Sequence, residues 1–278
     1  MLRTIPSRSR ARYVSLQKVG LLLRSTTSYN IELLNKRGVH YYPSLGSTSV
    51  ELRRLAEEGA PEGAVVLADS QSAGRGRRGR VWHSPPGKGL YFSLLLRPQR
   101  SKAAEAAALT LVAAVSTARL LRKSSGAAVT IKWPNDLLVD RKKLGGILTE
   151  AKSEGTVLHY LLLGIGLNLN HQIDDFPIEL RGRATSLALE SSRTLERTPL
   201  FLSLRETLLE DCRLFFGKGF APFQQPWKEM SATLGRTVEV ALPGKMLRGK
   251  AVDIGSTGAL LIEDEKGKRH HIRCGEII

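Results

Sequence analysis

The chain has 278 residues, 42 % of them hydrophobic, which is enough for one large domain with its own core and a smaller second unit. Lysine and arginine outnumber aspartate and glutamate by 42 to 26, and this net charge of +16 favours an anionic partner, whether nucleic acid, an acidic protein or a phosphorylated ligand. Cys212 and Cys274 are far apart and lack CxxC spacing, which argues against a disulfide framework or a zinc site and favours a reducing compartment. The most apolar helical run, 106–118, is shorter than the roughly 20 residues that a bilayer requires.

The N-terminal segment, residues 1–38, is rich in arginine and serine and contains one acid, Glu32. We expect a basic extension without a recognisable domain. Its composition fits an organelle transit peptide, a disordered tail or a start assigned too far upstream, and the pattern leaves all three open. No helix-turn-helix pattern precedes His40.

The next part of the chain, 39–231, carries alternating signals for strands and helices. A helix is expected from Thr48, as N-cap with Glu51 at position N3, to about residue 58. Another is expected to begin at Thr198, as N-cap before Pro199, and to end near residue 216. Further helices are predicted at 102–123 and 220–230, a short apolar element at 184–189, and strands at 40–42, 64–68, 90–96, 129–133, 137–139, 144–151 and 157–165. The last three of these strands are expected to form an antiparallel meander with turns at 140–141 and 154–155. Because strands and helices do not alternate regularly, the pattern predicts a mixed α+β sheet in preference to a doubly wound parallel one.

The last part of the chain, 232–278, consists of short strands separated by turns. Its length suits a five-stranded barrel, so we expect a small all-β module there. His270, His271 and Cys274 fall within it, and a position on the surface of the barrel explains them more simply than a metal site does.

Residues 73–80 hold four arginines and three glycines, a composition suited to wrapping an anion. Gly74, Gly76 and Gly79 match the spacing of a dinucleotide fingerprint, but residues 81–87 include two adjacent prolines and cannot open the required helix. The acid expected about 20 residues further on is also missing. Lys88 is not followed by Ser or Thr, so the P-loop pattern fails too. The position between two buried strands argues against a nucleic-acid patch.

Three further motifs bear chemically useful residues. Lys132, in the motif KWPND, lies in an otherwise apolar strand, where an ammonium group needs an anionic ligand or a structural salt bridge. Two glycines follow Lys143 and allow close backbone approach. Gly164, Gly166 and Asn168 end the predicted meander in the same way.

Together these motifs resemble the biotin protein ligases, the biotin–[acetyl-CoA-carboxylase] ligase family. The matching stretches follow the family's order from about residue 40 to the end of the chain: 46–48 (GST), 71–80 (QSAGRGRRGR), 82–85 (WHSP), 132–136 (KWPND), 143–148 (KLGGIL) and 164–168 (GIGLN). The resemblance implies a catalytic domain like that of class II aminoacyl-tRNA synthetases followed by an SH3-like barrel. It also implies that biotin is activated by MgATP to biotinyl-5′-AMP and then transferred to one lysine of a carboxyl carrier protein.

The family pattern assigns roles by position. Lys132 is implied as an electrostatic catalytic residue, assisted by Arg77 and Arg75. Contacts with biotin or its activated carboxyl group are implied for Ser47, Thr48, Gln71, Arg75, Gly76, Arg77 and Lys132, contacts with the adenylate for Arg80, Trp82 and Asn168, and the pocket wall for Gly164 and Gly166. Gly74 belongs to the same loop, whose glycines predict a segment that is loose until ligand orders it. Mg²⁺ is expected to arrive with ATP, with no protein metal site.

Some positions depart from the family pattern. Ser49 stands where asparagine is frequent, and the short extension that some members carry after a position equivalent to Ile278 is missing. The resemblance favours a monofunctional cytoplasmic ligase without a DNA-binding domain. A lipoate-type ligase and a DNA-binding, biotin-responsive repressor are the alternatives, and a homodimer is left open.

Overall fold

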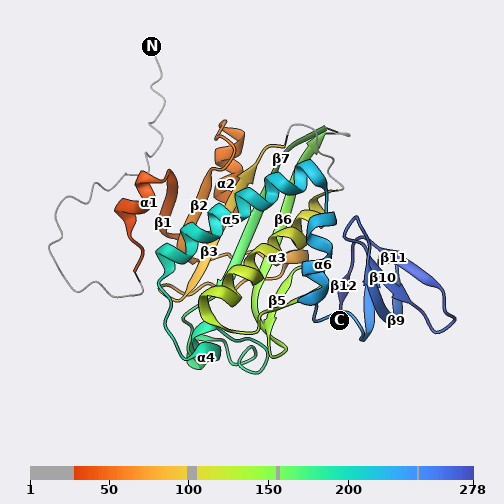
Figure 1. Ribbon diagram of the computed structural model, residues 1–278. Coiled ribbons are helices and arrows are strands. Elements are labelled where there is room, and N and C mark those ends of the chain that lie inside the picture. The colour runs from red at the N-terminus through yellow and green to blue at the C-terminus, as the bar shows by residue number, and fades with distance from the viewer. Residues whose placement is uncertain (1–27, 99–104, 155–156, 243) are drawn as a thin grey trace, which may run out of the picture.

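A seven-stranded mixed sheet with helices on both faces forms the larger part of the molecule (Figure 1). The computed structural model describes residues 28–98, 105–154, 157–242 and 244–278. The strand order is β1-β2-β3-β7-β6-β5-β4. This is the mixed α+β arrangement that the sequence predicts. No helix among the described residues is long and apolar enough to cross a membrane.

The first three strands are neighbours at one side of the sheet. β1 (Val39–Leu45) pairs in parallel with β2 (Val65–Gln71), and β2 pairs antiparallel with β3 (Gly89–Leu96). Every residue of β3 is buried, since both faces of this strand are covered. The register joins β3 to β7 from Gly89 opposite Asn168 to Leu96 opposite Leu161.

The other four strands form the predicted antiparallel meander. They are β4 (Thr130–Lys132), β5 (Asp136–Val139), β6 (Lys142–Glu154) and β7 (Val157–Asn168). The turn at residues 140–141 is confirmed, and both of its residues have positive φ, as the twist of a tight hairpin requires.

The helices are α1 (Ile31–Lys36), α2 (Thr48–Glu57), α3 (Ala106–Ser125), α4 (Leu187–Ser191), α5 (Arg197–Lys218) and α6 (Ala221–Glu229). α2 covers one face of the sheet, where Leu52 packs with Val66 and Leu162. α3 and α5 pack against each other over the opposite face (Figure 1). The beginning of the helix predicted from residue 102 lies outside the described residues.

Two expected helix caps are wrong. Ser47 occupies the N-cap position of α2, and Thr48 is already helical; its hydroxyl bonds to Gln71 instead of capping. Glu196 is the N-cap of α5, because the Thr198 hydroxyl accepts a hydrogen bond from the Asn30 backbone N–H at 2.8 Å. In both places a tertiary partner competes successfully for the hydroxyl group.

Part of the expected N-terminal extension belongs to the core. Leu34 of α1 is fully buried, and Tyr29 meets Tyr41 edge to face with ring centroids 5.6 Å apart. The guanidinium of Arg197 lies 4.1 Å from the centre of the Tyr29 ring. Tyr29 and Leu34 therefore anchor residues 28–38 to the core of the larger unit. The transit-peptide and tail interpretations concern residues 1–27, which lie outside the described residues.

A five-stranded antiparallel sheet forms the C-terminal module, as predicted. Its strands are β8 (Thr237–Leu242), β9 (Lys245–Ile254), β10 (Leu260–Glu263), β11 (Arg269–Ile272) and β12 (Glu276–Ile277), in the order β11-β10-β9-β8-β12. Ile254, Leu260 and Ile262 are fully buried within it. β12 brings the end of the chain back beside the arginine–glycine loop, residues 74–80, and this contact matters for the site.

Candidate active site

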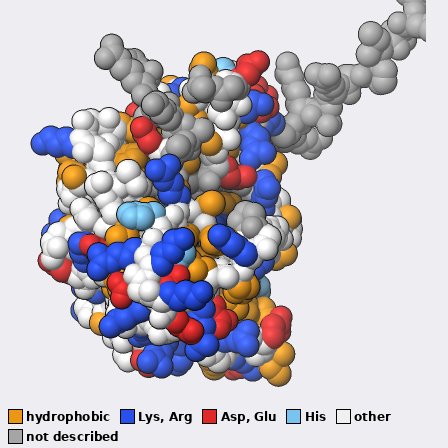
Figure 2. All heavy atoms as spheres, turned by 90° about the vertical axis from the view of Figure 1, so that its right-hand side faces the viewer, with side chains coloured by type: hydrophobic (Ala, Val, Ile, Leu, Met, Phe, Trp, Pro, Cys, Tyr) orange, Lys and Arg blue, Asp and Glu red, His pale blue; other side chains and the backbone are white. Residues whose placement is uncertain are grey.

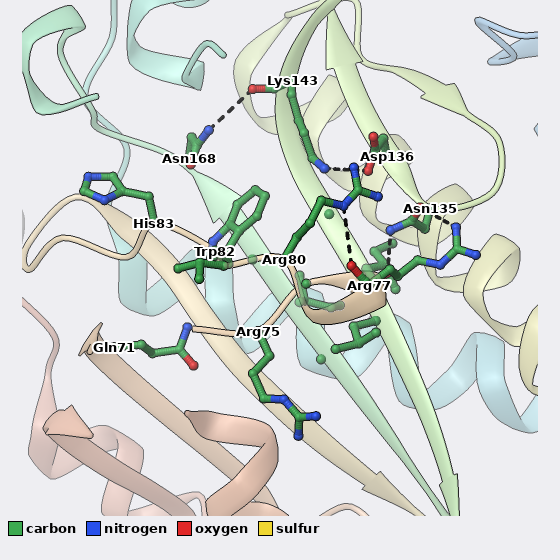
Figure 3. Close-up of a pocket in the computed structure, with 18 of the residues that line it drawn as sticks. Gln71, Arg75, Arg77, Arg80, Trp82, His83, Asn135, Asp136, Lys143 and Asn168 are labelled. Atoms are coloured by element: carbon green, nitrogen blue, oxygen red, sulfur yellow. Dashed lines mark hydrogen bonds and ion pairs between the residues drawn. The ribbon is translucent and has the colours of Figure 1, made fainter. Parts of the chain in front are cut away.

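A cavity of about 450 Å³ opens between the arginine–glycine loop, the start of α2 and strands β6 and β7 (Figure 3). With one exception, the residues expected at the site line it: Ser47, Thr48, Ser49, Gln71, Arg75, Gly76, Arg77, Arg80, Trp82, Lys132, Gly164, Gly166 and Asn168. The exception is Gly74. Segments more than 100 residues apart in sequence thus converge on one space.

Gly74 supports the loop from outside the cavity. Its carbonyl accepts a hydrogen bond from the Trp82 backbone N–H at 2.9 Å, and a β-carbon at this position would lie 2.4 Å from the Trp82 carbonyl oxygen. The loop then narrows at a bond from Gly76 N–H to the Arg80 carbonyl, and Arg78 takes a left-handed conformation with φ of 55°. Glycine is needed at position 74 because a larger residue would clash with the Trp82 carbonyl.

One end of the cavity is lined by neutral hydrogen-bonding groups. The side-chain oxygen of Gln71 accepts from the Thr48 backbone N–H at 2.8 Å, and its NH₂ group donates to the Ser84 hydroxyl at 3.0 Å. Ser93 donates to the Thr48 hydroxyl at 2.9 Å. The hydroxyl groups of Ser47 and Ser49 lie 3.2 Å apart. This end is suited to an uncharged ligand that both donates and accepts hydrogen bonds.

The Trp82 ring and the glycines of β7 line the middle of the cavity. The indole ring of Trp82 packs against β7, and a β-carbon on Gly166 would lie 2.5 Å from the indole nitrogen. That nitrogen is buried, and no described residue accepts its hydrogen. Only glycine at position 166 allows this contact between the ring and the strand.

The other end of the cavity is cationic. Lys132 pairs through its backbone with Asp136 of β5, but its ammonium group makes no hydrogen bond or ion pair with any described residue, so a structural salt bridge does not account for it within the described chain. Arg77 donates to the Asn135 side-chain oxygen at 3.2 Å and to the Gly275 carbonyl at 2.9 Å, which are neutral acceptors. Burial lowers the pKa of Arg77. These two cations suit a carboxylate or phosphate group.

Three other cations of the cavity, Lys143, Arg75 and Arg80, are paired with carboxylates, whereas the guanidinium of Arg183 makes no ion pair with a described residue. Lys143 contacts Asp136 at 2.7 Å and lies 5.5 Å from the centre of the Trp82 ring. Arg75 is 3.5 Å from Glu150, and both Arg78 and Arg80 contact Glu276. In Figure 3 the Arg75 side chain points away from Arg77 and Asn135.

Asn168 has a different environment from the one expected. Its NH₂ group donates to the carbonyls of Thr185 and Lys143 at 3.0 and 3.4 Å (Figure 3). Asn168 thus fastens the segment after β7 to the start of β6. Leu180 and Arg183 of this segment also line the cavity.

Several residues that line the cavity are not predicted as site residues from the sequence. Lys143 and Asn135 belong to the KLGGIL and KWPND motifs, and this position in a motif could have identified them. Ser93 is one hydroxyl in an apolar strand, and Arg183 lies in a loop without a motif. Only the packing of β3 beside α2 and of the loop beside β6 shows that they reach the cavity.

The described residues contain no group of three His, Cys, Asp or Glu side chains placed to hold a metal ion. Asp136 is the carboxylate that lines the cavity, and Lys143 already contacts its Oδ1 atom. His270 is paired with Asp264 at 2.7 Å, away from the cavity.

A mixed sheet with a cavity that is neutral at one end and cationic at the other, followed by a small β-module, defines a ligase-type catalytic fold. Residues 42–168 match the biotin/lipoate A/B protein ligase family, and residues 233–278 match the biotin protein ligase C-terminal domain. The chain belongs to this family, and specifically to its biotin protein ligases.

Individual relatives agree. The bifunctional ligase/repressor BirA of Bacillus spizizenii is 36 % identical over 92 % of this chain and 78 % of its own length. The biotin–[acetyl-CoA-carboxylase] ligase of Paracoccus denitrificans is 33 % identical over 80 % of this chain and 93 % of its own. The solved structure of the biotin protein ligase from Aquifex aeolicus in complex with biotin and ATP is 30 % identical, with a TM-score of 0.76 over 87 % of this chain and 98 % of that one.

Proposed function

We propose that the cavity carries out both halves of an ATP-dependent biotin ligation: biotin is activated to biotinyl-5′-AMP and then transferred to a lysine of a carboxyl carrier protein. The observation that carries this assignment is the free ammonium group of Lys132, which shares one cavity with Arg77 and with the neutral cluster around Gln71. A neutral ureido ring suits the first end, and a carboxylate beside a phosphate suits the second.

Activation brings two anions together. An oxygen of the biotin carboxylate attacks the α-phosphorus of ATP, the bond from that phosphorus to the bridging oxygen breaks, and pyrophosphate leaves with the electron pair. Arg77 and Lys132 stabilise the negative charge that concentrates on the oxygens in this transition state. Neither residue needs to move a proton in this step.

Transfer requires a neutral amine. The acceptor ε-amine attacks the carbonyl carbon of the mixed anhydride, the carbon–oxygen bond to AMP breaks, and the amine loses a proton. Because this anhydride is also open to attack by water, the arginine–glycine loop has to cover it between the two steps.

Several finer assignments belong to the same proposal. Asp136, the carboxylate that lines the cavity, could contribute to holding Mg²⁺, which would arrive with ATP and be bound chiefly by phosphate oxygens and water. Residues 39–231 form the catalytic unit and 232–278 the C-terminal module, supported by the separate match of 233–278. A reduced, cytoplasmic setting is supported by the two free cysteines. A homodimer is compatible with the fold.

The test is a transfer assay with the purified chain, biotin, MgATP and an isolated carrier domain. We expect a biotin-sized mass increase on one acceptor lysine, with one AMP and one pyrophosphate released per transfer. Replacing biotin by lipoate is the control for the lipoate-type alternative, which the match to a biotin-specific C-terminal domain does not favour. Preferential lipoyl transfer, or no transfer, would overturn the assignment.

A further inference from the structure

The four arginines of the loop have different partners, although the sequence presents them as one basic cluster. Three of them contact glutamates, and only Arg77 binds neutral acceptors alone. The two glutamates lie at opposite ends of the loop. Figure 2 shows the face that carries the C-terminal module, where Lys and Arg side chains are interspersed with carboxylates.

At the first end, Glu150 of β6 connects two walls of the cavity. Its Oε1 atom lies 2.8 Å from the guanidinium of Arg53 on α2 and 3.5 Å from that of Arg75 in the loop. The Glu150 side chain is 20 % exposed, and its other oxygen is buried with no partner among the described residues. Glu150 therefore faces two guanidinium groups, one from each of two walls of the cavity.

At the other end, Glu276 of β12 contacts two arginines of the loop. Its carboxylate is 3.3 Å from Arg78 and in direct contact with Arg80. Two backbone carbonyls of the C-terminal module add to the connection: Gly275 accepts from Arg77 at 2.9 Å and Ala241 from Arg78 at 3.4 Å. The loop is thereby tied to a module more than 150 residues away in sequence.

We propose that Glu150 and Glu276 are positioning residues that hold the arginine–glycine loop over the cavity and offset the charge of Arg75, Arg78 and Arg80. The cavity cations without a carboxylate partner are then Arg77, Lys132 and Arg183, and of these Arg77 and Lys132 face the carboxylate and the phosphate. This inference rests on the proposed ligation. It assigns Arg75 to positioning, where the family pattern implied catalysis.

The C-terminal module is then part of the active site. A loop bearing four uncompensated arginines would repel itself and Lys132 and would be drawn into solvent. With carboxylates at both ends, the loop is held before any ligand arrives, in contrast to the loose loop that its glycines predict, and less ordering entropy remains to be lost on binding. Losing either carboxylate should therefore weaken substrate binding more than it slows the chemical step.

The experiment compares Glu276→Gln and Glu150→Gln with two matched controls. Glu263→Gln removes a carboxylate that pairs with Arg269 in the same C-terminal module, and Glu154→Gln removes one that lies near His159 on the same strand as Glu150. Each variant is measured by trypsin cleavage within residues 74–80 without ligand, by KM and kcat for adenylate formation, and by Tm. Trypsin reads the loop directly and does not depend on activity.

We expect Glu276→Gln to increase cleavage of the loop and to raise KM for biotin and ATP by about three- to tenfold, with kcat within about twofold, as for a partly exposed ion-pair network. Glu150→Gln should do the same, and both controls should match the wild type. In a double-mutant cycle, Arg80→Gln with Glu276→Gln should weaken binding little more than either change alone.

Unchanged cleavage and KM in correctly folded Glu276→Gln and Glu150→Gln would overturn the positioning role. A loss confined to kcat, or a fall in Tm with unchanged loop cleavage, would also contradict it. If the wild-type chain forms no biotinyl-5′-AMP, the proposed function fails, whereas the trypsin result still tests the contacts of the loop.

Discussion

Gly166 and Trp82 are in such close contact that a single methyl group would separate them: a β-carbon on Gly166 would lie 2.5 Å from the indole nitrogen. This contact fixes the ring that closes the middle of the cavity. The neighbouring Gly146 faces the same ring at an ordinary van der Waals distance, 3.5 Å for an added β-carbon. Two glycines on adjacent strands thus have different tolerances for the same change.

The first prediction follows from this difference. Gly166→Ala should displace Trp82 and raise KM for ATP or biotin by about tenfold or more, because overpacking at this contact costs about 1–3 kcal/mol. Gly146→Ala should change KM by less than about threefold. Steady-state kinetics of pyrophosphate release measures both variants, and equal effects of the two changes would contradict the packing argument.

The second prediction concerns Lys132. Lys132→Met should lower kcat for adenylate formation by about 10²- to 10³-fold, because a preorganised positive charge is lost where negative charge develops. Arg77→Ala should act in the same direction. Lys218→Ala, an exposed lysine at the end of α5, is the matched control and should leave kcat unchanged. Biotin transfer at the wild-type rate by Lys132→Met would refute the assigned role.

The third prediction concerns the neutral end of the cavity. Gln71→Leu leaves the Thr48 backbone N–H without its 2.8 Å acceptor, and an unsatisfied buried donor costs about 1–3 kcal/mol. We expect KM for biotin to rise by about 10- to 100-fold while kcat changes little. Gln71→Glu keeps the acceptor oxygen and should raise KM less. Isothermal titration with biotin alone provides an independent measurement, and Gln71→Leu binding biotin as tightly as wild type would disprove the role.

The fourth prediction concerns stability and pH. Burial lowers the pKa of His171 to about 4, and its ring stacks on Phe176, which lines the cavity. The unfolded state therefore binds the extra proton between about pH 6.5 and pH 4, so stability should fall as the pH falls through this window, by up to about 3 kcal/mol. His171→Gln should flatten this slope. Urea unfolding of both proteins at several pH values tests it, and identical slopes would argue against a buried neutral imidazole.

The fifth prediction concerns the N-terminal boundary of the folded chain. Leu34 is fully buried, so Leu34→Ala should lower the free energy of unfolding by about 2–5 kcal/mol. Ile31, on the same helix, is 41 % exposed, and Ile31→Ala should cost well under half as much. Denaturant unfolding compares them. Equal stability of Leu34→Ala and the wild type would mean that α1 does not contribute to the core.

Local pattern was sufficient for most of the fold. The apolar runs that became β2 and β3, the turn at residues 140–141 and the strands of the C-terminal module are each encoded within a few residues. Helix caps were less predictable. A hydroxyl such as that of Thr198 can bond locally or to a distant backbone group, and nothing in the local sequence shows that Asn30 is near.

By itself, the sequence determined the family, the order of the elements and a set of site residues of which all but Gly74 line the cavity, because each motif keeps its residue types at fixed spacing. Only the tertiary structure decided what those residues do to one another. The charges of Arg75 and Arg80 look equivalent along the chain, but Glu150 and Glu276 contact them from different elements. Electrostatic pairing depends on distances through space, which local sequence does not specify, and it leaves the Lys132 ammonium group in the cavity without a partner among the described residues.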